Sequence, residues 1–97
     1  MSYIKFLREH VGHEPILTAG VGLFVFNNEN KVLMQLRTDY NQWGFPGGAM
    51  ELGESFEETA RRELKEETNL NIEEMKMIKV LSGNDTYREY PNGDKLY

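Results

Sequence analysis

The 97-residue chain contains no cysteine, only three prolines and a single tryptophan. Without cysteine, the protein has no disulfide framework and no thiol chemistry. No apolar run approaches the roughly 20 residues that a membrane-spanning helix needs. The N-terminal sequence MSYIKFLREHVGHE also lacks the apolar core of a secretory signal. We therefore expect a cytoplasmic protein with no membrane partner.

Basic residues are also scarce, because 11 Lys and Arg stand against 16 Asp and Glu and leave a formal net charge of −5. Binding of DNA or RNA depends largely on basic side chains that neutralise phosphates. We therefore expect no nucleic-acid partner. The charge does not exclude a small phosphorylated ligand, because a bound metal ion reverses the local charge.

The length allows one small domain, covering residues 1–97. Residues 1–15 are predicted to be an N-terminal helical segment, in which Ile4, Leu7 and Val11 share one side and a glycine ends the helix. A break at GHEP separates this segment from the rest of the chain.

The central sequence predicts a β-hairpin. Residues 16–26 have apolar side chains on both faces of a strand, NNENK is a turn, and VLMQLR returns as a second strand that ends at residue 37. A strand with two apolar faces needs cover on both sides. Beyond the hairpin, residues 38–48 are predicted to be mostly loop, 75–83 and 84–90 two further strands, and PNGD a turn.

An acidic helix is predicted over residues 56–68, with Ser55 as its cap, since Ser55 and Glu58 match the S-x-x-E capping box. Glu-rich helices most often have solvated faces, and one face of this helix fits that interpretation. Its i,i+4 ion pairs have the favourable order: Glu57 with Arg61, and Glu58 with Arg62.

The other face of the helix carries acids without such partners. At about 100° per residue, Glu63, Glu66 and Glu67 share an arc of roughly a quarter turn. Glu63 and Glu67 also point along the apolar stripe that faces the core, which consists of Phe56, Ala60 and Leu64. Burying unpaired carboxylates costs several kcal/mol unless a cation or protonation compensates. A divalent metal with oxygen ligands is the least costly solution.

Residues 48–70 read GAMELGESFEETARRELKEETNL and match the pattern G-x5-E-x7-R-E-U-x-E-E-x-G-U, where U is aliphatic, at eight of nine fixed positions. The matching residues are Gly48, Glu54, Arg62, Glu63, Leu64, Glu66, Glu67 and Leu70. With the preceding WGFPGG, this segment resembles the signature of the Nudix (MutT-like) hydrolases over about residues 16–97. Asn69 replaces the last glycine of the pattern. It follows the helix, where asparagine is the usual second choice for a left-handed cap.

The resemblance implies an α+β fold, an α/β/α sandwich around a mixed sheet, which would be incomplete at the C-terminus. It implies hydrolysis of a nucleoside diphosphate linked to another moiety, with Mg²⁺ or Mn²⁺ as the cofactor and a small nucleotide-derived substrate. By the same match, the metal ligands would be the carbonyl of Gly47 and the side chains of Glu63, Glu66 and Glu67. The catalytic residues would be Glu54, Arg62 and Glu66, and which acid is the general base stays open.

Substrate contacts are less well defined by the sequence. Arg37 ends the second predicted strand and could reach a substrate phosphate, although a solvent-exposed arginine is the more common case there. The aromatic residues could stack on a base or fill a small core: Trp43, Phe45, Tyr87 and Tyr90.

The short chain leaves two functional hypotheses. The first is a metal-dependent hydrolase, and the alternative is a catalytically inactive Nudix-like module that binds a nucleotide or a partner chain. Strands and a helix that the family has at its C-terminus are absent from this sequence, so apolar faces and a sheet edge would need cover. We therefore expect a homo-oligomer.

Overall fold

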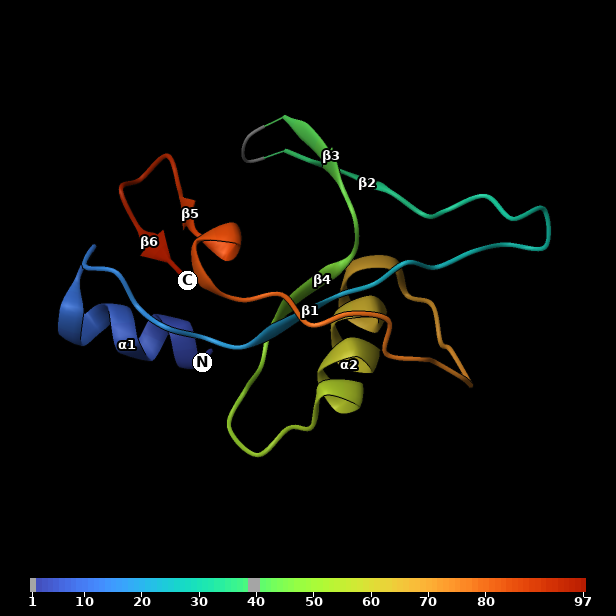
Figure 1. Ribbon diagram of the computed structural model, residues 1–97, viewed down its shortest axis with the longest axis horizontal. Helices are drawn as coiled ribbons and strands as arrows, with labels where there is room; N and C mark the ends of the chain where they lie inside the picture. The colour runs from blue at the N-terminus through green and yellow to red at the C-terminus, as the bar shows by residue number, and fades with distance from the viewer. Residues whose placement is uncertain (1, 39–40) are drawn as a thin grey trace.

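The computed structural model describes residues 2–38 and 41–97 and has an α+β architecture, which confirms the predicted class (Figure 1). The elements in these ranges are α1 (Tyr3–Val11), β1 (Gly20–Gly22), β2 (Gln35–Arg37), β3 (Gln42–Gly44), β4 (Gly47–Ala49), α2 (Phe56–Thr68), the 3₁₀ helix η1 (Gly83–Thr86), β5 (Arg88–Glu89) and β6 (Lys95–Leu96). In the described ranges, neither α-helix combines the length and apolarity that a membrane crossing requires.

Helix α1 occupies the position predicted for it. The Ser2 hydroxyl accepts the backbone N–H of Lys5 at 3.1 Å and so caps the first turn. Gly12 ends the helix with a φ of 61°, a conformation that other residues adopt only under strain. The helix contains no fully buried residue. Ile4 and Leu7 are half-buried, and Tyr3 and Arg8 make hydrogen bonds to distant parts of the chain.

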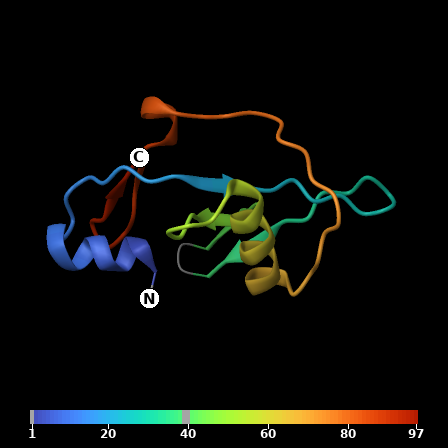
Figure 2. The same ribbon diagram turned by 90° about the horizontal axis from the view of Figure 1, so that it is seen from below.

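The strands in the described part of the chain pair as three antiparallel two-stranded sheets, where the resemblance implied one mixed sheet. β1 pairs with β4, β2 with β3, and β5 with β6. An isolated parallel bridge joins Ile16 to Leu96. Figures 1 and 2 both show the β5–β6 hairpin (red) beside α1 (blue), so the two ends of the chain lie together.

The predicted hairpin of residues 16–37 forms only near its turn. Phe26 bridges Val32, and the N–H of Leu33 donates to the carbonyl of Val25 at 2.7 Å. Beyond these contacts the two segments of the predicted hairpin do not pair with each other, because β1 pairs with β4 and β2 pairs with β3. The prediction of one long hairpin was therefore wrong in its pairing.

The segment predicted as a loop, residues 38–48, contains β3 and the start of β4, and its residues 39–40 lie outside the described residues. Glycine explains why β4 and β1 approach closely. A Cβ atom at Gly47 would collide with the carbonyl oxygen of Val21, and one at Gly20 would lie 2.6 Å from the carbonyl oxygen of Gly48. Glycine has no Cβ atom, so glycine at these two positions allows the backbones of β1 and β4 to approach this closely.

Helix α2 has the predicted boundaries and caps. The Ser55 hydroxyl accepts the N–H of Glu58 at 3.1 Å, and the Glu58 carboxylate accepts the N–H of Ser55 at 3.1 Å, which is a complete capping box. Asn69 ends the helix with φ 60° and ψ 18°, the left-handed geometry predicted for it. Helix α2 packs against β1 and β4, and Figure 1 shows it lying against these two strands.

The core lies where α2 meets the small sheet of β1 and β4. Its buried side chains are Leu23, Pro46, Thr59, Ala60 and Leu64. Phe56, which the helical projection placed on the core-facing stripe, is exposed. Phe56 is the first residue of α2, and the buried residues of the helix begin one turn later, at Thr59 and Ala60.

Residues 73–82, all of them described, form no strand, although 75–83 was predicted as one. The alternation of apolar residues along this segment is that of a strand, but a strand also needs a paired neighbour. The exposed apolar side chains here include Met77, Ile78, Val80 and Leu81. Residues 84–90 likewise give mainly η1 and the short β5, and the predicted turn at 91–94 does connect β5 with β6.

Candidate active site

Arg62 connects three acids at the face of α2 that meets β4. Its Nε and Nη2 donate to Glu54 at 2.6 and 3.0 Å, which makes a bidentate pair. Its Nη1 donates to Glu63 at 2.9 Å, and its Nη2 also donates to the carbonyl of Ala49 at 2.9 Å. Glu66 lies at the edge of this set, 3.3 Å from Nη1.

The predicted ion pair between Glu58 and Arg62 is absent, since Arg62 has the other partners just described and Glu58 belongs to the capping box. Helical spacing puts Glu58 and Glu66 within reach of Arg62, whereas Glu54 lies before the helix and is not specified by that spacing. The pair of Glu57 with Arg61 is present at 2.8 Å, as predicted. Arg62 therefore belongs to the acid cluster rather than to the solvated face.

Glu54 is held as a carboxylate. Its pKa is lowered from 4.5 to about 2, chiefly by the hydrogen bonds from Arg62, with contributions from the backbone N–H of Glu51 and the hydroxyl of Thr59, while burial opposes the shift. The Glu51 N–H and the Thr59 hydroxyl lie 2.8 and 3.1 Å from Oε1. A carboxylate with so low a pKa is a weak proton acceptor at neutral pH.

Thr59 and Glu51 contact the cluster but were not predicted to do so. Thr59 is fully buried, and its hydroxyl donates to Glu54. The projection that was used for the acids puts Thr59 about 40° from Glu63. A hydroxyl on the buried side of an acidic helix was therefore a usable signal. Glu51 could not have been found in this way, because its side-chain partner lies 48 residues away.

Glu63 lies against the backbone of β4. Its side chain is only 15% exposed, and a Cβ atom at Gly48 would lie 2.5 and 2.7 Å from its two carboxylate oxygens. Burial raises the pKa of Glu63, the hydrogen bond from Arg62 opposes this, and the charges of Glu67 and Glu66 raise the pKa further. The first glycine of the family pattern thus has a direct role here, since it leaves room for this carboxylate.

Glu67 reaches the neighbouring residue of β4. Its Oε2 accepts the backbone N–H of Gly47 at 3.0 Å. Glu63 and Glu67, the i,i+4 pair predicted to face the core, therefore contact consecutive glycines. The predicted role of Gly47 used its carbonyl oxygen, and that role stays a prediction.

The three acids of the predicted metal site share one side of the helix, but their carboxylates do not converge. Within residues 2–38 and 41–97, no group of three acidic or histidine side chains is arranged to hold an ion. The reason is electrostatic, because the like-charged carboxylates turn to donors within the protein: Glu63 and Glu66 to Arg62, and Glu67 to Gly47.

The donor set nevertheless fits a hard divalent cation. All its side-chain donors are carboxylate oxygens, which Mg²⁺ and Mn²⁺ prefer. The space at Gly48 holds the Glu63 carboxylate in a partly desolvated position that a cation would stabilise. Glu66 and Glu67 are exposed, and exposed side chains change rotamer within nanoseconds.

The remaining predicted contacts lie elsewhere. Arg37 is half-buried at the end of β2, opposite Gln42, and Figure 1 shows the β2–β3 hairpin apart from α2. Trp43 is 66% exposed and Phe45 is 44% exposed, so neither is a core residue. Phe45 packs edge-on against Phe24 with ring centroids 4.6 Å apart.

Comparison with known proteins identifies the family of this chain. The model of the NUDIX domain matches residues 16–96, and the chain therefore belongs to the Nudix family. The matched range contains every site residue described above, whereas α1 lies before it.

Three curated relatives illustrate the similarity. An RNA pyrophosphohydrolase of Pelagibacter ubique is 40% identical over 73 residues, which cover 73% of this chain and 45% of the relative. A putative 8-oxo-dGTP diphosphatase of Bacillus subtilis is 43% identical over 54 residues, 56% of this chain and 36% of the relative. An RNA pyrophosphohydrolase of Acinetobacter baylyi is 37% identical over 68 residues, 70% of this chain and 41% of the relative. The chain thus spans less than half the length of each.

Proposed function

We propose that this chain carries a metal-dependent site that hydrolyses a phosphoric anhydride bond in a nucleoside diphosphate linked to another moiety. The observation that carries the proposal is the position of Glu63, a partly desolvated carboxylate that lies against Gly48 beside the Glu67–Gly47 contact. Arg62 offsets part of the cost of burying this carboxylate, and a divalent cation would stabilise it further. Membership of the Nudix family supports the same conclusion, because Nudix hydrolases generally use divalent metals.

In the proposed site, Glu63 and Glu67 are the principal ligands of Mg²⁺ or Mn²⁺, with the Gly47 carbonyl as a further ligand, and Glu66 either binds a second ion or positions the attacking water. The bound ion would neutralise diphosphate oxygens and lower the pKa of a bound water. Arg62 orients Glu63, and Glu54 fixes Arg62 through its bidentate pair. Outer partners of this kind position metal ligands.

The general base was left open by the sequence, and the contacts favour Glu66 over Glu54. Both oxygens of Glu54 already accept hydrogen bonds, and its pKa is about 2. Glu66 is 58% exposed and has only long contacts with Arg62, at 3.3 and 3.5 Å. We therefore assign proton acceptance to Glu66 and a positioning role to Glu54.

The second candidate is an inactive module that binds a nucleotide or a partner chain. The observation in its favour is the unconverged set of carboxylates. Many large apolar side chains are also exposed, among them Leu17, Trp43 and Ile78. This candidate predicts a nucleotide-dependent rise in melting temperature without product formation.

A substrate panel separates the two candidates. The purified chain, with Mg²⁺ or Mn²⁺, would be incubated with ADP-ribose, a dinucleoside polyphosphate, 8-oxo-dGTP, a nucleotide sugar and a 5′-triphosphorylated RNA oligonucleotide. Products would be separated by ion-exchange chromatography, with Glu67→Gln as the inactive control. We expect turnover of a small nucleotide rather than the RNA, because the net charge of −5 disfavours a polyanion. Absence of turnover with every substrate would contradict the hydrolase.

A further inference from the structure

We propose that helix α1, which precedes the matched Nudix range, is a positioning element of the acid site and acts through Glu51. The helix and the site are joined by a continuous series of hydrogen bonds that starts at the first residue of α1 and ends at Glu63. This proposal deepens the proposed function, and it rests on that function only where metal binding is measured.

The first link is between Tyr3 and Glu51. Both carboxylate oxygens of Glu51 accept the backbone N–H of Tyr3, at 3.1 and 3.0 Å. Tyr3 is the first residue of α1, so this N–H has no partner within the helix. A carboxylate at a helix N-terminus is also favoured by the helix dipole. Glu51 thus anchors α1 to the loop between β4 and α2.

The next links lead from Glu51 to the metal-binding acids. The backbone N–H of Glu51 donates to Glu54 at 2.8 Å, and Glu54 accepts both donors of the Arg62 fork. Arg62 in turn donates to Glu63 at 2.9 Å. A shift of the Glu51 backbone therefore acts on Glu63 through the Glu54–Arg62 and Arg62–Glu63 ion pairs.

The other end of α1 is fixed to the C-terminal hairpin. Arg8 donates to the carbonyl oxygens of Gly12, Glu14 and Lys95 at 3.0, 2.7 and 2.6 Å. Its Nε makes no hydrogen bond and lies 3.6 Å from Asp94. His13 contacts the same carboxylate at 2.7 Å. The helix is therefore held at both ends.

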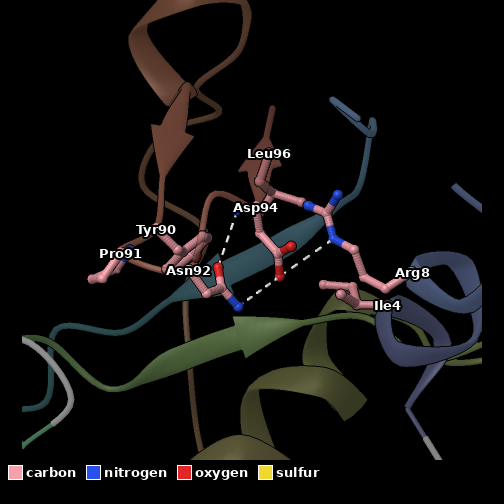
Figure 3. Close-up of a pocket in the computed structure, with 7 residues that line it drawn as sticks. All are labelled: Ile4, Arg8, Tyr90, Pro91, Asn92, Asp94 and Leu96. Carbon is pink, nitrogen blue, oxygen red and sulfur yellow. Dashed lines mark hydrogen bonds and ion pairs between the residues drawn. The ribbon is translucent and has the colours of Figure 1, made fainter. Parts of the chain in front are cut away.

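A hollow of about 390 Å³ lies between α1 and the hairpin, and its lining residues are drawn in Figure 3: Ile4, Arg8, Tyr90, Pro91, Asn92, Asp94 and Leu96. Its charged groups face one another, because Asp94 contacts Arg8 and accepts from Asn92 at 3.2 Å. We interpret the hollow as a joint that sets the direction of α1, because Arg8 in its lining connects the helix to Asp94 and to the Lys95 carbonyl of the hairpin.

A purely stabilising role for α1 explains these contacts less well. A helix that stabilises a fold does so mainly by burying an apolar face. Helix α1 buries no residue completely, and Phe6 and Val11 are 47% and 40% exposed. Ile4 and Leu7 are only half-buried, and the hydrogen bonds that tie the helix to distant parts of the chain come from Tyr3 and Arg8, which suits an element that positions another part of the protein.

The test removes one donor and leaves the helix intact. Proline is tolerated at the first position of a helix and lacks an N–H, so Tyr3→Pro deletes the link to Glu51. Ser2 already has the extended backbone that a following proline requires, with ψ 152°. Tyr3→Ala is the matched control, because it removes the same side chain and keeps the N–H. Glu9→Ala changes an exposed acid of α1 as a second control.

Two measurements report on the series of hydrogen bonds from Tyr3 to Glu63. Free Mn²⁺ would be titrated by electron paramagnetic resonance, and the Arg62 Nε–H resonance would be observed by NMR without metal. We expect Tyr3→Pro to weaken Mn²⁺ binding about three- to tenfold relative to Tyr3→Ala, less than the 10- to 100-fold effect of direct outer partners. It should also shift or broaden the Arg62 resonance. Glu51→Ala should reproduce both effects, and Glu51→Gln, which keeps an acceptor oxygen, should restore much of the wild-type behaviour.

The outcomes separate this inference from the proposed function. If wild type binds no Mn²⁺, the metal site is wrong, and the Arg62 resonance still decides the role of α1. An unchanged Arg62 resonance in folded Tyr3→Pro and Glu51→Ala proteins overturns the positioning role. A fall in melting temperature with no change in either readout also overturns it, because that result assigns α1 a stabilising role only.

Discussion

The carboxylate of Glu63 occupies the space that a side chain at Gly48 would fill, with a Cβ atom there lying 2.5 and 2.7 Å from its two oxygens. This contact joins the helix that carries the acids to the strand that faces them. It also gives the first glycine of the Nudix pattern a physical role in this chain.

We predict that Gly48→Ala disrupts the site and largely spares the fold. The added methyl group meets the far end of a flexible side chain, so Glu63 can move away at a cost of about 1 kcal/mol or less. The metal-dependent rise in melting temperature should then fall strongly. Gly44→Ala is the control, because a Cβ atom there meets nothing within 4 Å. Equal metal responses in both variants would contradict the prediction.

We predict that Mg²⁺ or Mn²⁺ raises the melting temperature by mass action, and that Glu67→Gln removes most of the rise. The glutamine keeps an acceptor for the Gly47 N–H and removes only the charge. If the chain is active, turnover should fall by a few orders of magnitude. Glu57→Gln, on the solvated face of the same helix, should retain the wild-type response. Differential scanning fluorimetry with and without metal tests this.

We predict that Asn69→Gly changes the free energy of unfolding by less than about 1 kcal/mol, whereas Asn69→Val is clearly destabilising. Asn69 has a φ of 60°, which glycine adopts freely and a β-branched residue does not. Urea denaturation of the three proteins measures the difference. Equal stability of the valine and glycine variants would be the contrary result.

We predict that Glu54 stabilises the fold above about pH 4.5 and that this contribution disappears as the pH falls towards 2. Its pKa is lowered from 4.5 to about 2 on folding, chiefly by Arg62, so the folded state resists the proton that the unfolded state binds. Glu63, whose pKa is raised, acts in the opposite direction. Comparison with Glu54→Gln isolates the effect. The stability difference between the two proteins should shrink on acidification, and a constant difference would argue against the prediction.

We predict that the chain self-associates. Its accessible surface is 7639 Å², about 1,900 Å² above the value of about 5,700 Å² expected for a folded monomer of 11.3 kDa. Its radius of gyration of 14.3 Å also exceeds the expected value of about 12.5 Å. A stable interface covers about 800 Å² on each partner. Light scattering of dilute protein measures the mass, and a compact monomer with cooperative, ordinary stability would exclude the prediction.

The sequence alone determined helix α2 and the arc of its acids. The capping box of Ser55 and Glu58, the left-handed Asn69 and the shared side of Glu63 and Glu67 follow from contacts within a few residues. Helical hydrogen bonds are local, so the spacing of residues specifies them directly. The same is true of α1, which begins after Ser2 and ends before Gly12.

The tertiary structure decided which partners these side chains take. Arg62 could pair with Glu58 by spacing, and it pairs with Glu54 and Glu63 because β4 and its loop approach that face of α2. Strand pairing depended on the same long-range packing. Gly20 pairs with Ala49 although the sequence favoured a local hairpin, and residues 73–82 have strand periodicity without forming a strand. A strand's hydrogen bonds belong to another segment, so local periodicity cannot choose its neighbour, and only the folded chain brings Glu51 to Tyr3.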